Sequence, residues 1–183
     1  MIFLPKTWIT LSLVFTSVCI ITPIYAKESG TWKDSKTSLT WQRCSLGQTW
    51  NGYDCDGEPR QYTWEDAQQA ANAVGKGWRV PAASELMSLV RCNTGFQNTS
   101  TFPDRKGVNK TMPNFCNEGV SRPTIDTTIF PNTPDAGYWS SSPVAVDNDY
   151  AWFVGFSYGG GGGYARDGLK SYNHYVRLVR ASQ

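Results

Sequence analysis

The sequence predicts a mixed fold in which helices pack against short antiparallel strands. Large apolar residues recur at every second position over residues 151–157 and 175–180, which is the spacing of half-buried strands. Residues 64–74 and 82–91 carry apolar residues at helical spacing instead. We expect the two C-terminal strands to pair antiparallel across residues 158–173, a glycine- and tyrosine-rich loop that supplies little core.

The first 26 residues have the pattern of a secretory signal peptide. Lys6 precedes an apolar run over residues 8–21, and the segment ends at Ala26. An uncleaved membrane anchor is the alternative, although the run is short for a bilayer span. We expect cleavage after Ala26, no membrane contact afterwards, and a secreted, periplasmic or cell-surface location. We expect residues 27–38 to form an exposed segment ahead of the domain, which we call the lead-in. We expect residues 39–183 to form a single domain.

The net charge argues against a nucleic-acid partner. The 17 Lys and Arg residues fall to 16 when Lys6 leaves with the signal peptide, against 15 Asp and Glu, so the net charge is +1. A nearly neutral chain lacks the basic surface that holds a phosphate backbone. We therefore expect no nucleic acid among the partners, and the charge leaves the oligomeric state open.

Four cysteines remain after removal of the signal peptide, and three pairings are open to them. We expect the disulfides Cys44–Cys55 and Cys92–Cys116, because each closes a short loop rich in Gly, Asn and Asp. A zinc site is the alternative, but no two cysteines have the C-x-x-C spacing and the only histidine, His174, is distant in sequence. The sequence thus predicts no metal and no cofactor.

After the lead-in, we expect a first strand at Leu39–Gln42. A loop follows, and then a first helix. Thr63 stands where it can cap a helix over residues 64–74, with Asp66 three positions later as in a capping box. Gly75 follows the last apolar residue of this pattern and predicts the end of the helix.

A second helix is expected over residues 82–91, where Pro81 starts it and Leu86 and Leu89 belong to its buried stripe. Residues 93–128 show no sustained periodicity and predict a long irregular loop. This loop contains a candidate patch for an anionic ligand. The patch consists of Arg105, Lys106 and Lys110.

Seven motifs occur in order along the mature chain. They are LTWQRC at 39–44, YTWEDAQQAA at 62–71, GWRVPAASELMSLV at 77–90, IFPNTP at 129–134, YWSSSP at 138–143, AWFVGF at 151–156 and YVRLVR at 175–180. Together they resemble the bacterial family of the Lcl C-terminal domain, also called DUF1566. The resemblance implies an α+β fold that is C-type-lectin-like and related to the formylglycine-generating enzyme. In that fold two helices pack on a small twisted antiparallel sheet with long irregular loops.

One position departs from the family pattern. Ala82 stands where the family often has a threonine that caps the second helix, although Glu85 is kept. Loss of such a capping oxygen typically costs about 1 kcal/mol, so the fold expectation is unchanged.

The C-terminal segment concentrates tyrosine among Gly, Ser, Asn and Asp, a mixture typical of adaptable binding surfaces. We expect a secreted or surface-displayed lectin-like module, not an enzyme, that recognises a glycan or a protein ligand at the cell surface. The candidate ligand-binding residues are Asp147, Asn148, Asp149, Tyr150, Ser157, Tyr158, Tyr164, Arg166, Asp167, Lys170, Tyr172, Asn173 and His174. Arg166, Lys170 and the basic patch favour a sulfated glycan, which the family resemblance also implies.

Two further hypotheses concern the same segment. Residues 147–174 are rich in the amino acids that adenine mutagenesis of Asn codons produces, so they are a candidate variable target of a diversity-generating retroelement. The alternative function is a structural subunit of a pilus, fibre or envelope assembly, in which the aromatic surface is buried against a partner.

Overall fold

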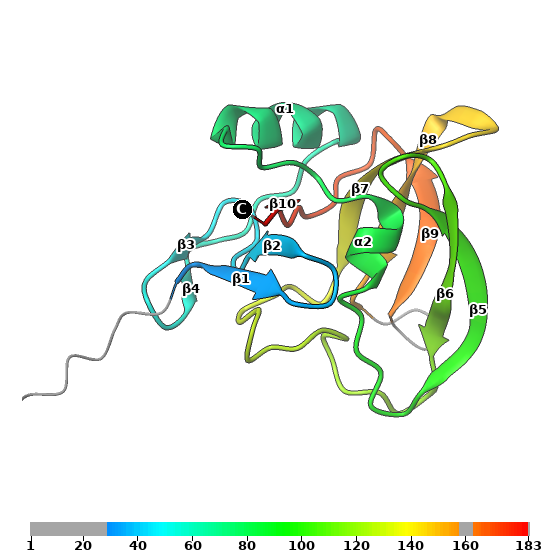
Figure 1. The fold of residues 1–183 in the computed structure, drawn as a ribbon, viewed down its shortest axis with the longest axis horizontal. Helices are drawn as coiled ribbons and strands as arrows, with labels where there is room; N and C mark the ends of the chain where they lie inside the picture. The colour runs from blue at the N-terminus through cyan, green and yellow to red at the C-terminus, as the bar shows by residue number, and fades with distance from the viewer. Residues whose placement is uncertain (1–28, 158–162, 183) are drawn as a thin grey trace, which may run out of the picture.

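A computed structural model describes residues 29–157 and 163–182, which form ten strands and two helices (Figure 1). The strands are β1 (Thr31–Asp34), β2 (Leu39–Gln42), β3 (Thr49–Trp50), β4 (Cys55–Asp56), β5 (Phe96–Pro103), β6 (Asn109–Cys116), β7 (Gly137–Val144), β8 (Asp147–Gly155), β9 (Tyr164–Leu169) and β10 (Val179–Ala181). The helices are α1 (Trp64–Val74) and α2 (Ala83–Met87). The expected signal peptide, residues 1–26, lies outside the described residues. In the described part, no helix has the length and apolar character needed to cross a membrane.

The predicted fold class is wrong, because the described structure is mostly β. It has four small sheets, with the strand orders β1-β2-β10, β3-β4, β5-β6 and β7-β8-β9. It is therefore not a C-type-lectin-like α+β fold with two helices packed on one sheet. α1 has eleven residues and lies against β7, whereas α2 has five and lies among β5 to β9. The difference arises because segments expected as helix or loop form strands or turns.

The second helix is shorter than predicted. α2 ends at Met87, before the predicted end at residue 91. The chain then turns, and Val90 forms an antiparallel bridge with Ile125. Leu89 and Val90 are nevertheless buried, so the apolar spacing reflects burial in a turn rather than a continued helix.

Residues 93–128, expected as an irregular loop, contain the antiparallel hairpin of β5 and β6. Most side chains of both strands are exposed, so the sequence lacks the apolar alternation that predicts a strand. In β5 only Phe102 is fully buried, and its ring meets the Trp152 ring edge-on with 5.6 Å between the centroids. This contact anchors β5 against β8, and β6 is held against β9 by the hydrogen bond from the Ala165 N–H to Asn114 Oδ1 at 3.1 Å.

The predicted strand over residues 151–157 is present as β8, but its partners are not those expected. β8 pairs with β7 on one side and with β9 on the other. Because β9 lies within the predicted glycine- and tyrosine-rich loop, that loop prediction is wrong, as is the pairing of β8 with residues 175–180. Instead, the Tyr175 carbonyl accepts a hydrogen bond from the backbone N–H of Trp139 in β7 at 2.9 Å, and β10 pairs with β2.

Part of the expected lead-in, residues 27–38, belongs to a sheet. β1 pairs antiparallel with β2, with Trp32 opposite Trp41. The Trp32 ring also meets the Phe130 ring edge-on with 5.5 Å between the centroids. Asp34 is buried at the end of β1, where its carboxylate accepts a hydrogen bond from the Thr37 hydroxyl at 2.7 Å.

Several local predictions are confirmed. The Thr63 hydroxyl caps α1 by accepting a hydrogen bond from the Asp66 N–H at 3.3 Å. Gly75 ends the helix with a φ of 67°, in the region that favours glycine. Both predicted disulfides, Cys44–Cys55 and Cys92–Cys116, are present.

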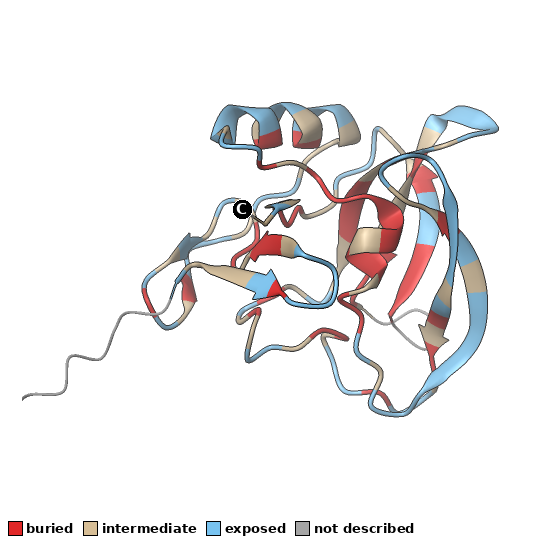
Figure 2. Cartoon of the chain, in the orientation of Figure 1, coloured by how far each residue is buried: buried red, intermediate tan, exposed pale blue. Residues whose placement is uncertain are grey.

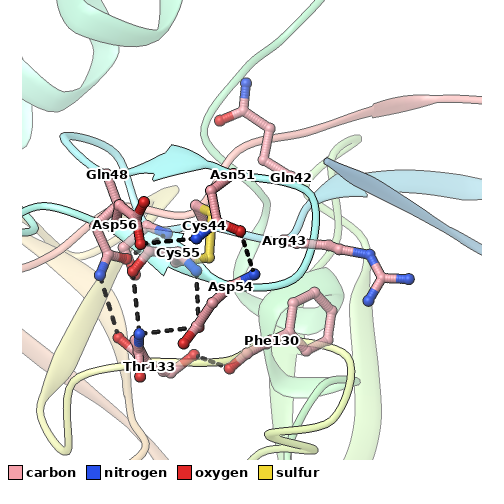
Figure 3. Close-up of a disulfide and its surroundings, with 12 residues drawn as sticks. Gln42, Arg43, Cys44, Gln48, Asn51, Asp54, Cys55, Asp56, Phe130 and Thr133 are labelled. Atoms are coloured by element: carbon pink, nitrogen blue, oxygen red, sulfur yellow. Dashed lines mark hydrogen bonds between the residues drawn. A yellow bond between two sulfur atoms is a disulfide. The ribbon is translucent and has the colours of Figure 1, made fainter. Parts of the chain in front are cut away.

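The first disulfide lies in a loop that is also hydrogen bonded to a distant segment (Figure 3). The side-chain amide of Asn132 donates to the Asp54 carboxylate at 2.9 Å and to the Cys55 carbonyl at 3.0 Å. The loop is therefore fixed both by the covalent bond and by the chain that leads into β7.

Two clusters of buried apolar side chains form the core. The larger includes Leu86 of α2, Phe102 of β5 and Val154 of β8. The smaller lies beneath α1 and includes Ala67 and Trp139. Figure 2 shows that burial is concentrated in α2 and in the β7-β8-β9 sheet, whereas the outer side of α1 and much of the β5–β6 hairpin are exposed.

Candidate ligand-binding surface

Three connections define what we call the turn end of the molecule: the β5–β6 turn (residues 104–108), the β7–β8 turn (residues 145–146) and the loop after β9 (residues 170–173). A groove of about 630 Å³ joins the first two. A polar hollow of about 610 Å³ joins the start of β8 to the loop after β9 and to the start of α1. The β7–β8 turn thus separates two concave sites, and it projects from the body at the upper right of Figure 1.

Lys170 is the cation of the polar hollow. Its Nζ lies 4.5 Å from the centroid of the Trp64 ring and 3.5 Å from Asn148 Oδ1. Its backbone N–H donates to the Asp149 carbonyl at 2.9 Å, which ties the loop after β9 to the start of β8. The structure therefore brings together three predicted site residues that lie up to 22 positions apart in sequence.

The basic patch lies at the β5–β6 turn. Asp104 Oδ1 accepts hydrogen bonds from the backbone N–H groups of Lys106 at 2.8 Å and Val108 at 3.0 Å. The Lys110 ammonium lies 3.8 Å from Asp104 Oδ2. The pKa of Asp104 is lowered, and the hydrogen bond from the Lys106 N–H is the largest cause. The hydrogen bond from the Val108 N–H and the charges of Lys110 and Lys106 lower it further. Within the described residues, the side chains of Arg105 and Lys106 have no hydrogen-bond or ion-pair partner, so both cations are available to a ligand.

The remaining predicted residues are spread over the β7-β8-β9 sheet and its connections. Asp147, Arg166, Asp167, Tyr172 and Asn173 are exposed, and Tyr150 and Ser157 are half-buried. Arg166 and Asp167 are adjacent on β9 and therefore point to opposite faces of the sheet. Tyr158 lies outside the described residues.

Tyr164 and His174 lie in a row of aromatic side chains rather than on the open surface. The Tyr164 ring stacks on the Phe115 ring with 5.5 Å between the centroids. The His174 ring stacks on the Phe153 ring at 4.4 Å and meets the Trp139 ring edge-on at 4.5 Å. Burial among these rings lowers the pKa of His174 to about 4, so the imidazole is neutral at pH 7.

Sequence reasoning does not assign Thr63, Glu65 or Trp152 to a site. Thr63 and Glu65 have the pattern of a helix start, yet both line the polar hollow. Trp152 has the pattern of an apolar strand face, yet its half-buried ring lines the groove. No local signal marks these residues, because their sites exist only where distant connections meet.

The described residues contain no group of three or more His, Cys, Asp or Glu side chains arranged to hold a metal ion. Asp147 instead uses its carboxylate within its own turn, where Oδ1 accepts the Asp149 N–H at 3.0 Å. The turn end thus offers cations, carboxylates, amides, hydroxyls and apolar side chains to a ligand.

The fold and this surface define a class of protein: a small, disulfide-linked, mostly β module with polar and cationic connections at one end. The family model of the Lcl C-terminal domain matches residues 30–180, and the chain belongs to that family. The match confirms the resemblance inferred from the seven sequence motifs. No curated protein and no solved structure matches the chain.

Family membership indicates a surface or secreted module. The two disulfides are compatible with this, because such bonds persist in oxidising compartments.

Proposed function

We propose that this chain is a lectin-like binding module that works outside the cytoplasm and holds an anionic glycan, such as a sulfated polysaccharide, at its turn end. The observation that carries the proposal is the position of the cations. Arg105 lines the groove on one side of the β7–β8 turn, with Lys106 next to it in the β5–β6 turn, and Lys170 lines the polar hollow on the other side. The proposal gives the chain no catalytic role.

The surroundings of these cations suit a polar, flexible polymer. Sulfate or carboxylate groups pair with ammonium and guanidinium groups through charge-assisted hydrogen bonds. Sugar hydroxyls find donors and acceptors in Asn148 and Ser171 of the polar hollow. Tyr172, which is 57% exposed, adds an amphipathic ring beside this hollow. Because these pairs are exposed to solvent, their contribution should fall as salt concentration rises.

Heparin-column retention of residues 27–183 tests the proposal. We expect Lys106→Glu and Lys170→Glu each to elute at a lower salt concentration than the parent, because each reverses one charge at the turn end. Lys33→Glu is the matched control, since Lys33 is an exposed residue of β1, away from the turn end. Retention of the parent no stronger than that of a neutral protein, or an equal loss in the control, would contradict the proposal.

We further propose that the exposed part of residues 147–174 is the variable target of a diversity-generating retroelement. The exposure of Asp147, Asn148, Asp149, Tyr172 and Asn173 supports this, because such positions tolerate many side chains. Gly168 should instead stay constant, since a β-carbon there would lie 3.2 Å from the Phe153 ring. The test is a genomic search for a neighbouring reverse-transcriptase gene and a near-copy of this segment that differs at adenines. Absence of both would end the idea.

A further inference from the structure

The groove between the β5–β6 turn and the β7–β8 turn differs in chemistry from the polar hollow beside it. Its walls and floor are largely apolar. The residues that give it this character are Pro103, Pro143, Val144, Ala145, Val146 and Trp152. Its volume, about 630 Å³, is within the range of roughly 300–1,000 Å³ that is usual for ligand pockets.

The floor of the groove is held in place from beneath. The Trp152 ring packs edge-on against the buried Phe102 ring, and the Trp152 carbonyl accepts a hydrogen bond from the Ser140 hydroxyl at 2.7 Å. Val146, which also lines the groove, is 94% exposed. Together with the neighbouring apolar residues of the groove, this exposed side chain makes an apolar patch of the kind that a partner covers.

Two polar side chains of the groove are already hydrogen bonded within the protein. The Ser142 hydroxyl already accepts the Ala83 N–H at 3.1 Å. The Asp104 carboxylate is occupied by two amides of its own turn and by Lys110. Because apolar side chains supply most of the exposed lining, an apolar side chain fits this groove better than a sugar ring does.

The rim adds a charge preference. The charged groups that face the groove are Asp104 and Arg105, and Asp104 is offset by Lys110 at 3.8 Å. Arg105 is exposed and, in the described part of the chain, has no partner. It favours a carboxylate beside whatever apolar group enters. The prolines at 103 and 143 lack backbone N–H groups, which limits β-strand addition along either wall.

We propose that this groove docks a polypeptide segment that carries an apolar side chain next to an acidic one. The apolar side chain packs on Trp152 between Val144 and Val146, and the carboxylate pairs with Arg105. The groove shares Arg105 with the glycan surface but is distinct from the polar hollow, and it gives the module a second, protein partner.

The test is an NMR titration of ¹⁵N-labelled residues 27–183 with short peptides in a Gly-Ser frame. The first peptide has a central Phe flanked by Asp, the second has the Phe flanked by Lys, and the third has Ser in place of the Phe. We expect the first peptide to shift the Trp152 indole and the amides of Val144 and Val146 saturably. The Lys version should bind about two- to fivefold more weakly, as for an exposed ion pair. The Ser version should leave these signals unchanged.

Two groove variants and one control variant, all at exposed positions, test whether the NMR shifts arise from binding in the groove. Val146→Ser should weaken binding of the Phe–Asp peptide. Val74→Ser should not, because Val74 is an exposed residue at the end of α1. Arg105→Glu should abolish the preference for Asp over Lys. The proposal would be overturned if the Ser peptide bound equally well or if no peptide shifted these groove signals. The heparin-column variants, Lys106→Glu and Lys170→Glu, leave the lining of the groove unchanged, so failure of the glycan proposal can be told apart from failure of this one.

Discussion

The guanidinium of Arg177 donates a hydrogen bond to the hydroxyl of Thr133 at 2.7 Å, and both side chains are buried. The same guanidinium donates to the carbonyls of Gln42 and Arg43 and lies 4.7 Å from the centroid of the Phe130 ring. All these partner groups are neutral, and burial lowers the pKa of Arg177. One side chain thus joins the end of β2, the chain before β7 and the C-terminal segment.

Replacement of Arg177 by methionine should reduce the free energy of unfolding by roughly 3 kcal/mol, since each buried carbonyl or hydroxyl left without a donor costs about 1–3 kcal/mol. Urea denaturation measures this change. Arg180→Met is the matched control, because Arg180 is half-buried and its guanidinium only overlies the Trp78 ring at 4.6 Å. Equal losses in the two variants would show that Arg177 does not organise the core.

His174 should make stability depend on pH. Burial lowers its pKa from 6.5 to about 4, so between these values the unfolded chain binds a proton that the folded chain does not. The stabilisation is present above pH 6.5 and is lost as the pH falls toward 4. His174→Phe keeps a ring between Phe153 and Trp139 but removes the titration. The melting temperature of the parent should therefore fall more than that of the variant between pH 7 and pH 4.5, and parallel curves would refute the assignment.

Gly163 should not tolerate a side chain. A β-carbon there would lie 2.5 Å from both Cys116 Sγ and Val90 Cγ1. Gly107→Ala is the control, because Gly107 also has positive φ but a β-carbon there would meet nothing within 4 Å. The control should lose about 1–2 kcal/mol from backbone strain alone. Gly163→Ala should lose roughly 1–3 kcal/mol more from overpacking. Urea midpoints that coincide for the two variants would contradict this explanation.

Each disulfide should contribute about 3 kcal/mol, because cross-linking restricts the unfolded chain. The Cys92–Cys116 bond should contribute slightly more than Cys44–Cys55, since it spans 24 residues rather than 11. Paired Cys→Ser variants of each bond, compared by urea denaturation without reductant, give the two values. If removal of Cys44–Cys55 lowered the free energy of unfolding markedly more than removal of Cys92–Cys116, the contacts of the shorter loop, such as those with Asn132, would depend on its disulfide.

The sequence predicted the features that depend on residues close together along the chain. Thr63 caps α1 because its hydroxyl reaches an amide three residues later. The two disulfides join the cysteines nearest to each other in sequence, and the short loops rich in Gly, Asn and Asp between them favoured this pairing. The seven motifs were sufficient for the family, which the match over residues 30–180 confirms.

The same reasoning misplaced the segments whose structure depends on distant partners. The β5–β6 hairpin was missed because its side chains are mostly exposed, and an exposed strand has no apolar alternation. The strand pairing within β7-β8-β9 was missed because a glycine-rich segment has low strand propensity, yet β9 is held by β8 along its length.

The sequence by itself therefore determined the family, the disulfide pairs, the first helix and the approximate positions of β2 and β8. The tertiary structure decided the mostly β architecture, the burial of His174 and the meeting of Arg105, Trp152 and Lys170 around one turn. The physical reason is that caps and short loops are stabilised by local contacts. Strand partners and surface sites are instead stabilised by hydrogen bonds and packing between distant segments, which a local pattern does not encode.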